Sequence, residues 1–107
     1  MFDIVRYQRE DRSEPYTEWY RRLRDRIAKA AITMRLDRLQ GGNFGDCKPV
    51  GDGVQELRIH TGPGYRIYFG IHGTRLVILL LGGDKPTQSS DITKAKALWA
   101  EWQRRQP

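Results

Sequence analysis

The sequence predicts an α+β fold in which a small sheet of about four strands is packed by helices. Apolar and polar residues alternate on both sides of Gly62-Pro63-Gly64, which is typical of two half-buried strands joined by a short turn. Two earlier stretches carry apolar residues at helical spacing, and a later run is apolar at every position. At 107 residues the chain has the usual size of one domain, so we expect a single domain over 1–107.

The first half of the chain predicts one strand and two helices. Alternating apolar residues over 2–7 suggest a short opening strand. Ser13-Glu14-Pro15 favours a helix start, because it offers a cap, an early acid and a proline tolerated in the first turn. Apolar residues over 25–39 predict a second helix that Gly41-Gly42-Asn43 ends.

The second half predicts three hairpin-linked strands and a final helix. Residues 41–53 are predicted to form a loop with Lys48 and Pro49 at its centre. The two strands in which apolar and polar residues alternate follow this loop. The apolar run over 76–81 should have both faces covered, which places it inside the sheet. Ser89-Ser90-Asp91 predicts the cap of the last helix, in which Trp99 and Trp102 are interpreted as packing anchors.

Polar side chains suited to an RNA phosphate gather on one face of the two alternating strands. Taking every second residue places Arg58 and His60 on the face that also carries Arg66 and Tyr68 from the next strand. Arginine offers paired donors to phosphate oxygens, and histidine exchanges a proton near neutral pH. Arg58 and Arg66 are the first candidates for gripping one phosphate.

The charge of the chain favours a polyanionic partner. The net charge is +6 and the isoelectric point is near 9.8. The two predicted helices form either a docking surface for ribosomal RNA or a merely solubilising face, through the residues Arg21, Arg22, Arg24, Arg26, Lys29, Arg35 and Arg38.

The sequence favours a cytoplasmic protein without metal or cofactor. Charged residues interrupt the N-terminal stretch, and no apolar run is long enough for a membrane span. Cys47 is the single cysteine and lacks an evident base partner, so an inert or semi-buried thiol is favoured over a nucleophile. No Cys/His set or carboxylate cluster offers ligands for a catalytic metal.

Several short motifs, taken together, resemble the RelE/HigB toxins of type II toxin-antitoxin systems, in particular the HigB-like addiction module killer branch. They are Gly45-Asp46-x-Lys48-Pro49-Val50-Gly51-x-Gly53, Glu56-Leu57-Arg58, Gly64-Tyr65-Arg66-x-Tyr68 and Gly82-Gly83-Asp84-Lys85. The resemblance implies a βααβββα fold and a ribosome-dependent endoribonuclease that cuts mRNA. It also implies a small helix-turn-helix antitoxin, which neutralises the toxin and with it binds promoter DNA.

The resemblance assigns Lys85 to charge stabilisation or to proton donation to the leaving oxygen, while the general base stays open. His60 suits that role by its usual pKa, which is about 6.5. Some ribosome-dependent relatives carry lysines where this chain has Val54 and Glu56. Glu56 either serves as the base or pairs with an arginine on the same face.

Two further residues are expected to contact substrate. Lys48 belongs to the first of the motifs, and Tyr68 follows Arg66 on the same face. Tyr68 either stacks on a base or positions a phosphate, or else covers the edge of the core. The rival to an enzyme is a non-catalytic basic module that binds RNA or protein, or a relative whose catalytic set has decayed.

Overall fold

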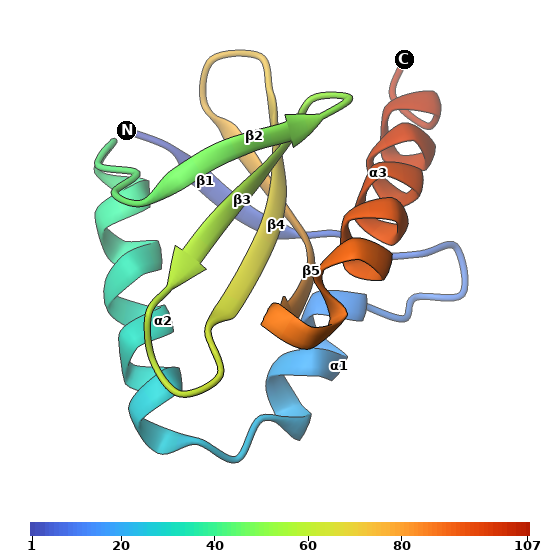
Figure 1. Cartoon of the computed structure of the whole chain (residues 1–107). Coiled ribbons are helices and arrows are strands. Elements are labelled where there is room, and N and C mark those ends of the chain that lie inside the picture. Colours follow the sequence, from blue (N-terminus) through green and yellow to red (C-terminus); the bar gives the residue numbers. More distant parts are fainter.

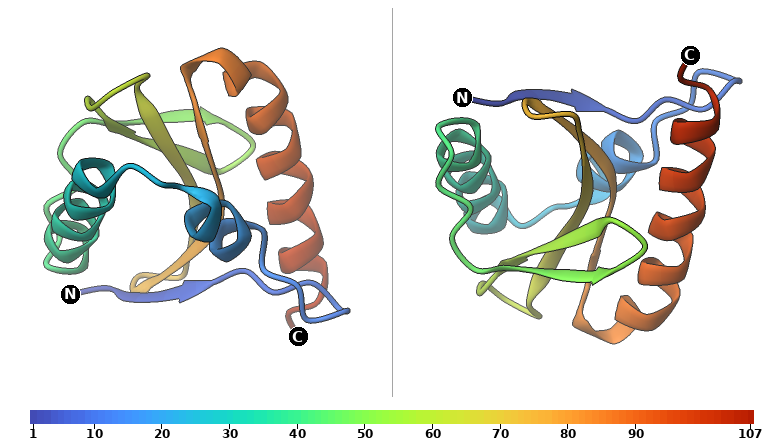
Figure 2. Two further views of the ribbon diagram at one scale, coloured as in Figure 1. Left: turned by 90° about the horizontal axis from the view of Figure 1, so that it is seen from below. Right: turned by 90° about the horizontal axis from the view of Figure 1, so that it is seen from above.

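The computed structural model describes residues 1–107 and contains one sheet with helices on both sides (Figures 1 and 2). The elements are β1 (Asp3–Arg6), α1 (Pro15–Arg22), α2 (Arg26–Gln40), β2 (Cys47–Gly51), β3 (Val54–Ile59), β4 (Tyr65–His72), β5 (Leu76–Asp84), the 3-10 turn η1 (Lys85–Thr87) and α3 (Gln88–Arg104). This arrangement confirms the α+β fold. It has one strand more than the predicted element order.

The strand order is β1-β5-β4-β3-β2. β1 runs parallel to β5, and the other neighbouring pairs are antiparallel. β5 therefore lies inside the sheet, as its apolar sequence predicted. It continues beyond the apolar run, because Gly82 and Gly83 pair with Ile67 and Arg66 of β4.

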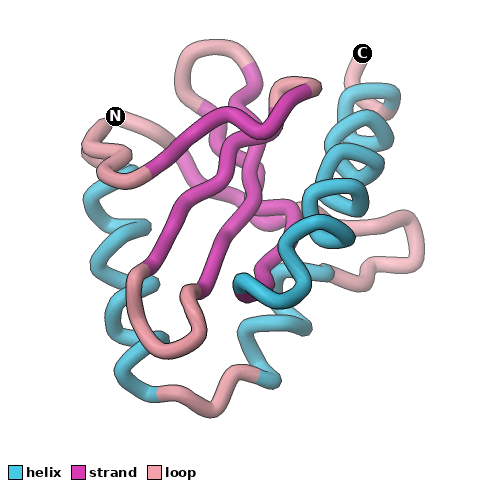
Figure 3. Tube along the Cα trace, viewed as in Figure 1, coloured by secondary structure: helices cyan, strands magenta, loops and turns pink.

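The extra strand, β2, lies within residues 41–53, where the sequence predicted a loop, so that prediction was wrong (Figure 3). β2 pairs with β3, and Lys48 lies opposite Glu56. Pro49 is compatible with this strand because β2 is at the edge of the sheet, where one side of the backbone needs no partner. Gly51 and Gly53 have φ values of +105° and +84°, which glycine adopts readily and which make the tight turn into β3.

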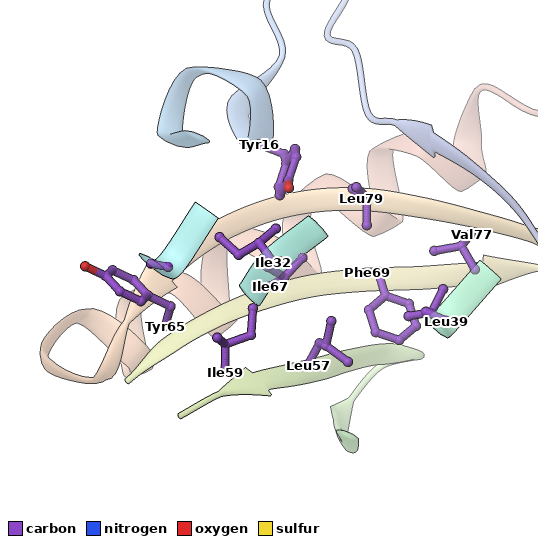
Figure 4. Packing of buried hydrophobic residues seen from close by; sticks show 11 residues of the cluster. Tyr16, Ile32, Leu39, Leu57, Ile59, Tyr65, Ile67, Phe69, Val77 and Leu79 are labelled. Carbon is purple, nitrogen blue, oxygen red and sulfur yellow. The ribbon is translucent and has the colours of Figure 1, made fainter. Parts of the chain in front are cut away.

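The two faces of the sheet carry separate hydrophobic clusters. α1 and α2 cover one face, where Leu57 and Ile67 belong to a cluster with Ile32 of α2, as Figure 4 shows. α3 covers the other face through Ala95, Leu98 and Trp99. The alternation in β3 and β4 thus predicted correctly which of their residues face α2.

Two tryptophans fix the helices on glycine positions of the sheet. A Cβ atom at Gly82 would lie 2.1 Å from the Trp19 ring, and one at Gly70 would lie 2.6 Å from the Trp99 ring. No other residue fits under these rings. Trp99 is 3% exposed and stacks on Trp102 with 5.3 Å between ring centroids, which confirms both as packing residues. α3 is therefore held firmly beside β4 and β5.

The start of α3 differs from the predicted one. The helix begins at Gln88, directly after η1, and Asp91 lies inside its first turn, where its carboxylate accepts a hydrogen bond of 2.5 Å from the Thr87 hydroxyl. Lys85 is accordingly in a helical turn and not in a loop. Pro86 fits that turn, because proline is tolerated at the first positions of a helix. None of the helices combines the length and the apolar character needed to cross a membrane.

Candidate active site

A shallow depression of about 530 Å³ lies where the end of β3, the start of β4 and η1 meet. All four side chains that the sequence selected as catalytic line it, namely Arg58, His60, Arg66 and Lys85. The connection between β3 and β4, residues 60–64, forms the rest of the wall. In Figure 1 this connection is the loop between the yellow-green ends of the two strands.

The two arginines are directly opposite each other across the β3–β4 ladder. Like charges in this position destabilise a sheet unless something offsets them. Glu56 does so: its Oε1 accepts a 2.9 Å hydrogen bond from Arg58 Nε, and its Oε2 lies 3.5 Å from Arg66 Nε. The Glu56 side chain is 0% exposed, whereas those of Arg58 and Arg66 are 28% and 11% exposed.

Glu56 is ionised and occupied, which argues against a role as the general base. Burial alone would raise its pKa, but hydrogen bonds from Arg58 and Gln88 and the nearby charge of Arg66 outweigh burial and hold the pKa below its ordinary value. The buried Tyr68 hydroxyl lies beside the same carboxylate. Of the two roles that the sequence left open for Glu56, the structure therefore favours pairing with arginine.

Gln88 is a partner of this cluster that the sequence did not indicate. Its Nε2 donates a 2.9 Å hydrogen bond to Glu56 Oε2. Gln88 is the first residue of α3 and is separated from Glu56 by 32 residues. No local pattern in the sequence points to such a contact. The sequence also placed the start of the last helix at 89–91, so Gln88 was not expected to belong to it.

His60 pairs with Asp46, through its Nε2 and the Asp46 Oδ2 atom. The hydrogen bond from His60 is the main cause that lowers the pKa of Asp46, so Asp46 is ionised at neutral pH. An ionised carboxylate only accepts hydrogen bonds, so His60 Nε2 is the donor, and Nδ1 is the acceptor whenever the imidazole is neutral. Asp46 stands in a quoted motif, but its pairing with His60 was not predicted.

The loop that carries Asp46 is tied to α2 by Arg35. The Arg35 guanidinium donates hydrogen bonds of 3.1 Å to the carbonyls of Phe44 and Asp46, and another to the carbonyl of Arg58. Arg35 is therefore a structural residue and not part of a free cationic surface. Its contacts hold Asp46 close to the end of β3 and so to His60.

Lys85 lies at the rim of the depression. It is exposed and takes part in none of the ion pairs of the structure. Its Cβ atom would lie 3.8 Å from a Cβ atom at Gly64, whose carbonyl accepts a 3.1 Å hydrogen bond from Arg66 Nη1. Lys85 and Arg66 therefore lie on either side of Gly64, and both can border one ligand in the depression.

Tyr68 and Lys48 do not line the depression. Tyr68 is 0% exposed and packs between β5 and α3 with Tyr7, Ile78 and Leu80, and burial raises the pKa of its hydroxyl. The expectation that Tyr68 contacts substrate therefore needs correction, because the residue is part of the core. Lys48 is exposed on the face of Glu56, its partner across β2 and β3, outside the depression.

Four arginines lie around the connection between α1 and α2, a segment that we call the arginine turn: Arg21, Arg22, Arg24 and Arg26. All are exposed, and none is in an ion pair. The turn contacts the β3–β4 end of the sheet, because the Tyr65 hydroxyl donates a 3.4 Å hydrogen bond to Asp25 Oδ2. The connection between α1 and α2 therefore lies beside the strand ends that border the depression.

Other reactive groups have no place in this arrangement. Cys47 is half-buried on β2, and burial raises the pKa of its thiol, which makes it a poor nucleophile. No three His, Cys, Asp or Glu side chains lie together in a way that would hold a metal ion. The basic side chains that line the depression are those of Arg58, Arg66, Lys85 and His60.

Comparison with known proteins identifies the family. Residues 18–100 match the family model "Phage derived protein Gp49-like (DUF891)". A Haemophilus influenzae protein described as "Uncharacterized protein" is 52% identical over 86 residues, which cover 80% of this chain and 87% of that protein. With most of the sequence matched, the chain belongs to the Gp49-like phage-derived family, a family of toxins from toxin-antitoxin systems.

Proposed function

We propose that this toxin is an endoribonuclease that cuts mRNA on the ribosome by attack of a ribose 2′-hydroxyl on the adjacent phosphate, without a catalytic metal. The observation that carries the proposal is the meeting of Arg58, Arg66, Lys85 and His60 around one depression. Family membership supports a toxin, and the four side chains supply the groups that this reaction needs.

In the proposed reaction the 2′-oxygen forms a bond to phosphorus, and the bond from phosphorus to the 5′-oxygen of the next nucleotide breaks. His60 accepts the 2′-hydroxyl proton at Nδ1, because Nε2 is engaged with Asp46. Arg58 and Arg66 stabilise the extra negative charge on the phosphorane through fixed donors. Lys85 gives a proton to the departing 5′-oxygen and regains one from solvent.

The ribosome has a physical part in this scheme. The His60 side chain is 73% exposed, and that of Asp46 is 46% exposed, so the base is the least enclosed of the proposed catalytic groups. A bound ribosome would orient the 2′-hydroxyl toward it, an effect that positioning can supply at large magnitude. The arginine turn suits contacts with ribosomal RNA, because its cations are exposed and unpaired.

The partners follow from the family. A toxin of a toxin-antitoxin system has an antitoxin. We propose that it is a small helix-turn-helix protein, that it masks the cationic surfaces in the cytoplasm, and that the pair binds promoter DNA through the antitoxin. Mutual masking is expected because a chain of net charge +6 would otherwise attract any RNA.

The exposure of His60 also favours a second candidate, a basic module that binds RNA without cutting it. Expression of the chain alone, and together with the proposed helix-turn-helix antitoxin, tests toxicity. We expect growth arrest that co-expression relieves. Growth arrest without any cut mRNA would favour the binding module, and normal growth at verified soluble expression would contradict both the enzyme and the toxic binder.

A further inference from the structure

Glu56 is a buried charge that the proposed reaction does not use as acid or base. Its side chain is 0% exposed, its carboxylate contacts Arg58, Arg66 and Gln88, and the buried Tyr68 hydroxyl also lies beside it. A buried carboxylate is costly unless it is paired and hydrogen-bonded. The Glu56 carboxylate directly contacts two candidate catalytic residues, Arg58 and Arg66.

The contacts of Glu56 occupy the inner edges of the two guanidinium groups. Arg58 donates from Nε and has no hydrogen bond from its terminal nitrogens. Arg66 points Nε toward the carboxylate at 3.5 Å and uses Nη1 on the Gly64 carbonyl. The terminal nitrogens of Arg58 and Nη2 of Arg66 thus stay available to phosphate oxygens in the depression.

Gln88 fixes the carboxylate itself. Its Nε2 donates to Oε2, the oxygen that faces Arg66, whereas Arg58 bonds to Oε1. The carboxylate cannot rotate without breaking one of these contacts. Gln88 also follows η1, so the segment that carries Lys85 and the segment that holds Glu56 are continuous in the chain.

We propose that Glu56 and Gln88 are positioning residues, which hold Arg58 and Arg66 in a phosphate-binding geometry before substrate arrives. The inference rests on the proposed function insofar as the phosphate belongs to RNA. One carboxylate between two cations allows the arginines to lie side by side in the empty protein. Pre-set donors stabilise a transition state without the cost of ordering them during the reaction.

The substitution Gln88→Leu tests this role without changing charge, and Gln103→Leu on the exposed end of α3 is its control. Inorganic phosphate is titrated into each full-length protein and followed by the arginine Nε–Hε signals in NMR. We expect phosphate affinity about tenfold weaker in Gln88→Leu and unchanged in Gln103→Leu. Equal phosphate affinity in Gln88→Leu and the unmodified chain, with both folded, would overturn the proposal.

Glu56→Gln gives a second readout if Gln88→Leu does not fold. In the unmodified chain the Arg58 Nε–Hε signal, assigned with Arg58→Lys, should exchange slowly with water, and in Glu56→Gln it should broaden or vanish. A signal that exchanges equally fast in both proteins would show that Glu56 does not hold Arg58.

RNA cleavage separates this proposal from the proposed function. In single-turnover assays on ribosomes, Gln88→Leu should lower the maximal rate about tenfold; the concentration for half-maximal rate should change less than the phosphate affinity, because under the proposed function contacts with the ribosome contribute to binding as well. If the unmodified chain cuts no RNA while phosphate binding still depends on Gln88, the proposed function fails and the positioning role stands. If cleavage occurs and Gln88→Leu changes neither rate nor phosphate affinity, the positioning role fails alone.

Discussion

Replacing Glu56 by glutamine should destabilise the folded protein by about 3 kcal/mol at neutral pH. Removing one member of a buried ion pair typically costs about 3 to 5 kcal/mol, because the partner charge stays desolvated. The lower end applies, since the side chains of Arg58 and Arg66 are 28% and 11% exposed and keep part of their hydration. Such a loss lowers the melting temperature by roughly 12 °C in a domain of this size.

The pH dependence of this loss has a definite sign. The folded pKa of Glu56 is below its value in the unfolded chain, which is about 4.3. The carboxylate therefore stabilises the fold above that unfolded pKa, and this contribution disappears as the pH falls through the folded pKa. The difference in stability between the two proteins should be full at neutral pH and should shrink steadily in acid.

Urea unfolding at several pH values measures the effect, with Glu10→Gln as the control. Glu10 is exposed and forms no ion pair, so its substitution should change the free energy of unfolding by less than about 0.5 kcal/mol. A cost for Glu56→Gln below about 1 kcal/mol at neutral pH, or a cost that does not change on acidification, would refute the argument.

Two other predictions concern RNA. Arg66→Ala should lower cleavage on ribosomes about a hundred- to a thousandfold, while Arg75→Ala in the exposed β4–β5 turn should not. Arg66→Ala should still fold, because Glu56 keeps its hydrogen bonds from Arg58 and Gln88. A folded Arg66→Ala variant with normal cleavage would exclude Arg66 from catalysis. The double variant Arg24→Gln/Arg26→Gln should bind an uncleavable 2′-O-methyl RNA with a weaker salt dependence, the slope of log binding constant against log salt concentration falling by about 1.4 to 1.8. The control Arg75→Gln/Arg104→Gln makes the same charge change on exposed residues outside the arginine turn and should leave this slope unaltered. Equal slopes for both double variants would make the arginine turn a solubilising surface.

The sequence predicted the fold class and which site residues share a face of the sheet. It did not predict every strand, or which side chains are covered by a helix. Alternation in β3 and β4 was sufficient to place Arg58 and Arg66 on one face of neighbouring strands, and the register of the structure sets them directly opposite each other. It misjudged Tyr68, which is covered by α3 beside an irregularity in the β4–β5 register between Tyr68 and Phe69. Alternation alone cannot show whether a polar face is later covered by a helix.

Other features depend on contacts between distant segments. β2 was missed because glycines and Pro49 suggest a loop, and only pairing with β3 makes an edge strand of them. Asp46 and Gln88 were missed as partners because they reach His60 and Glu56 from 14 and 32 residues away. Hydrogen bonds of this kind leave no periodic signal in a single sequence.

The chemistry of the cut ends tests the central claim most directly. Purified protein is added to translating ribosomes, with magnesium kept only at the level that preserves the ribosomes, and the mRNA fragments are mapped by ligation and phosphatase sensitivity. Attack by the 2′-hydroxyl predicts a 2′,3′-cyclic phosphate on the upstream fragment and a 5′-hydroxyl on the downstream one. A 5′-phosphate on the downstream fragment would show that water, and not the ribose, attacks the phosphate, and would contradict the mechanism assigned to Arg58, His60, Arg66 and Lys85.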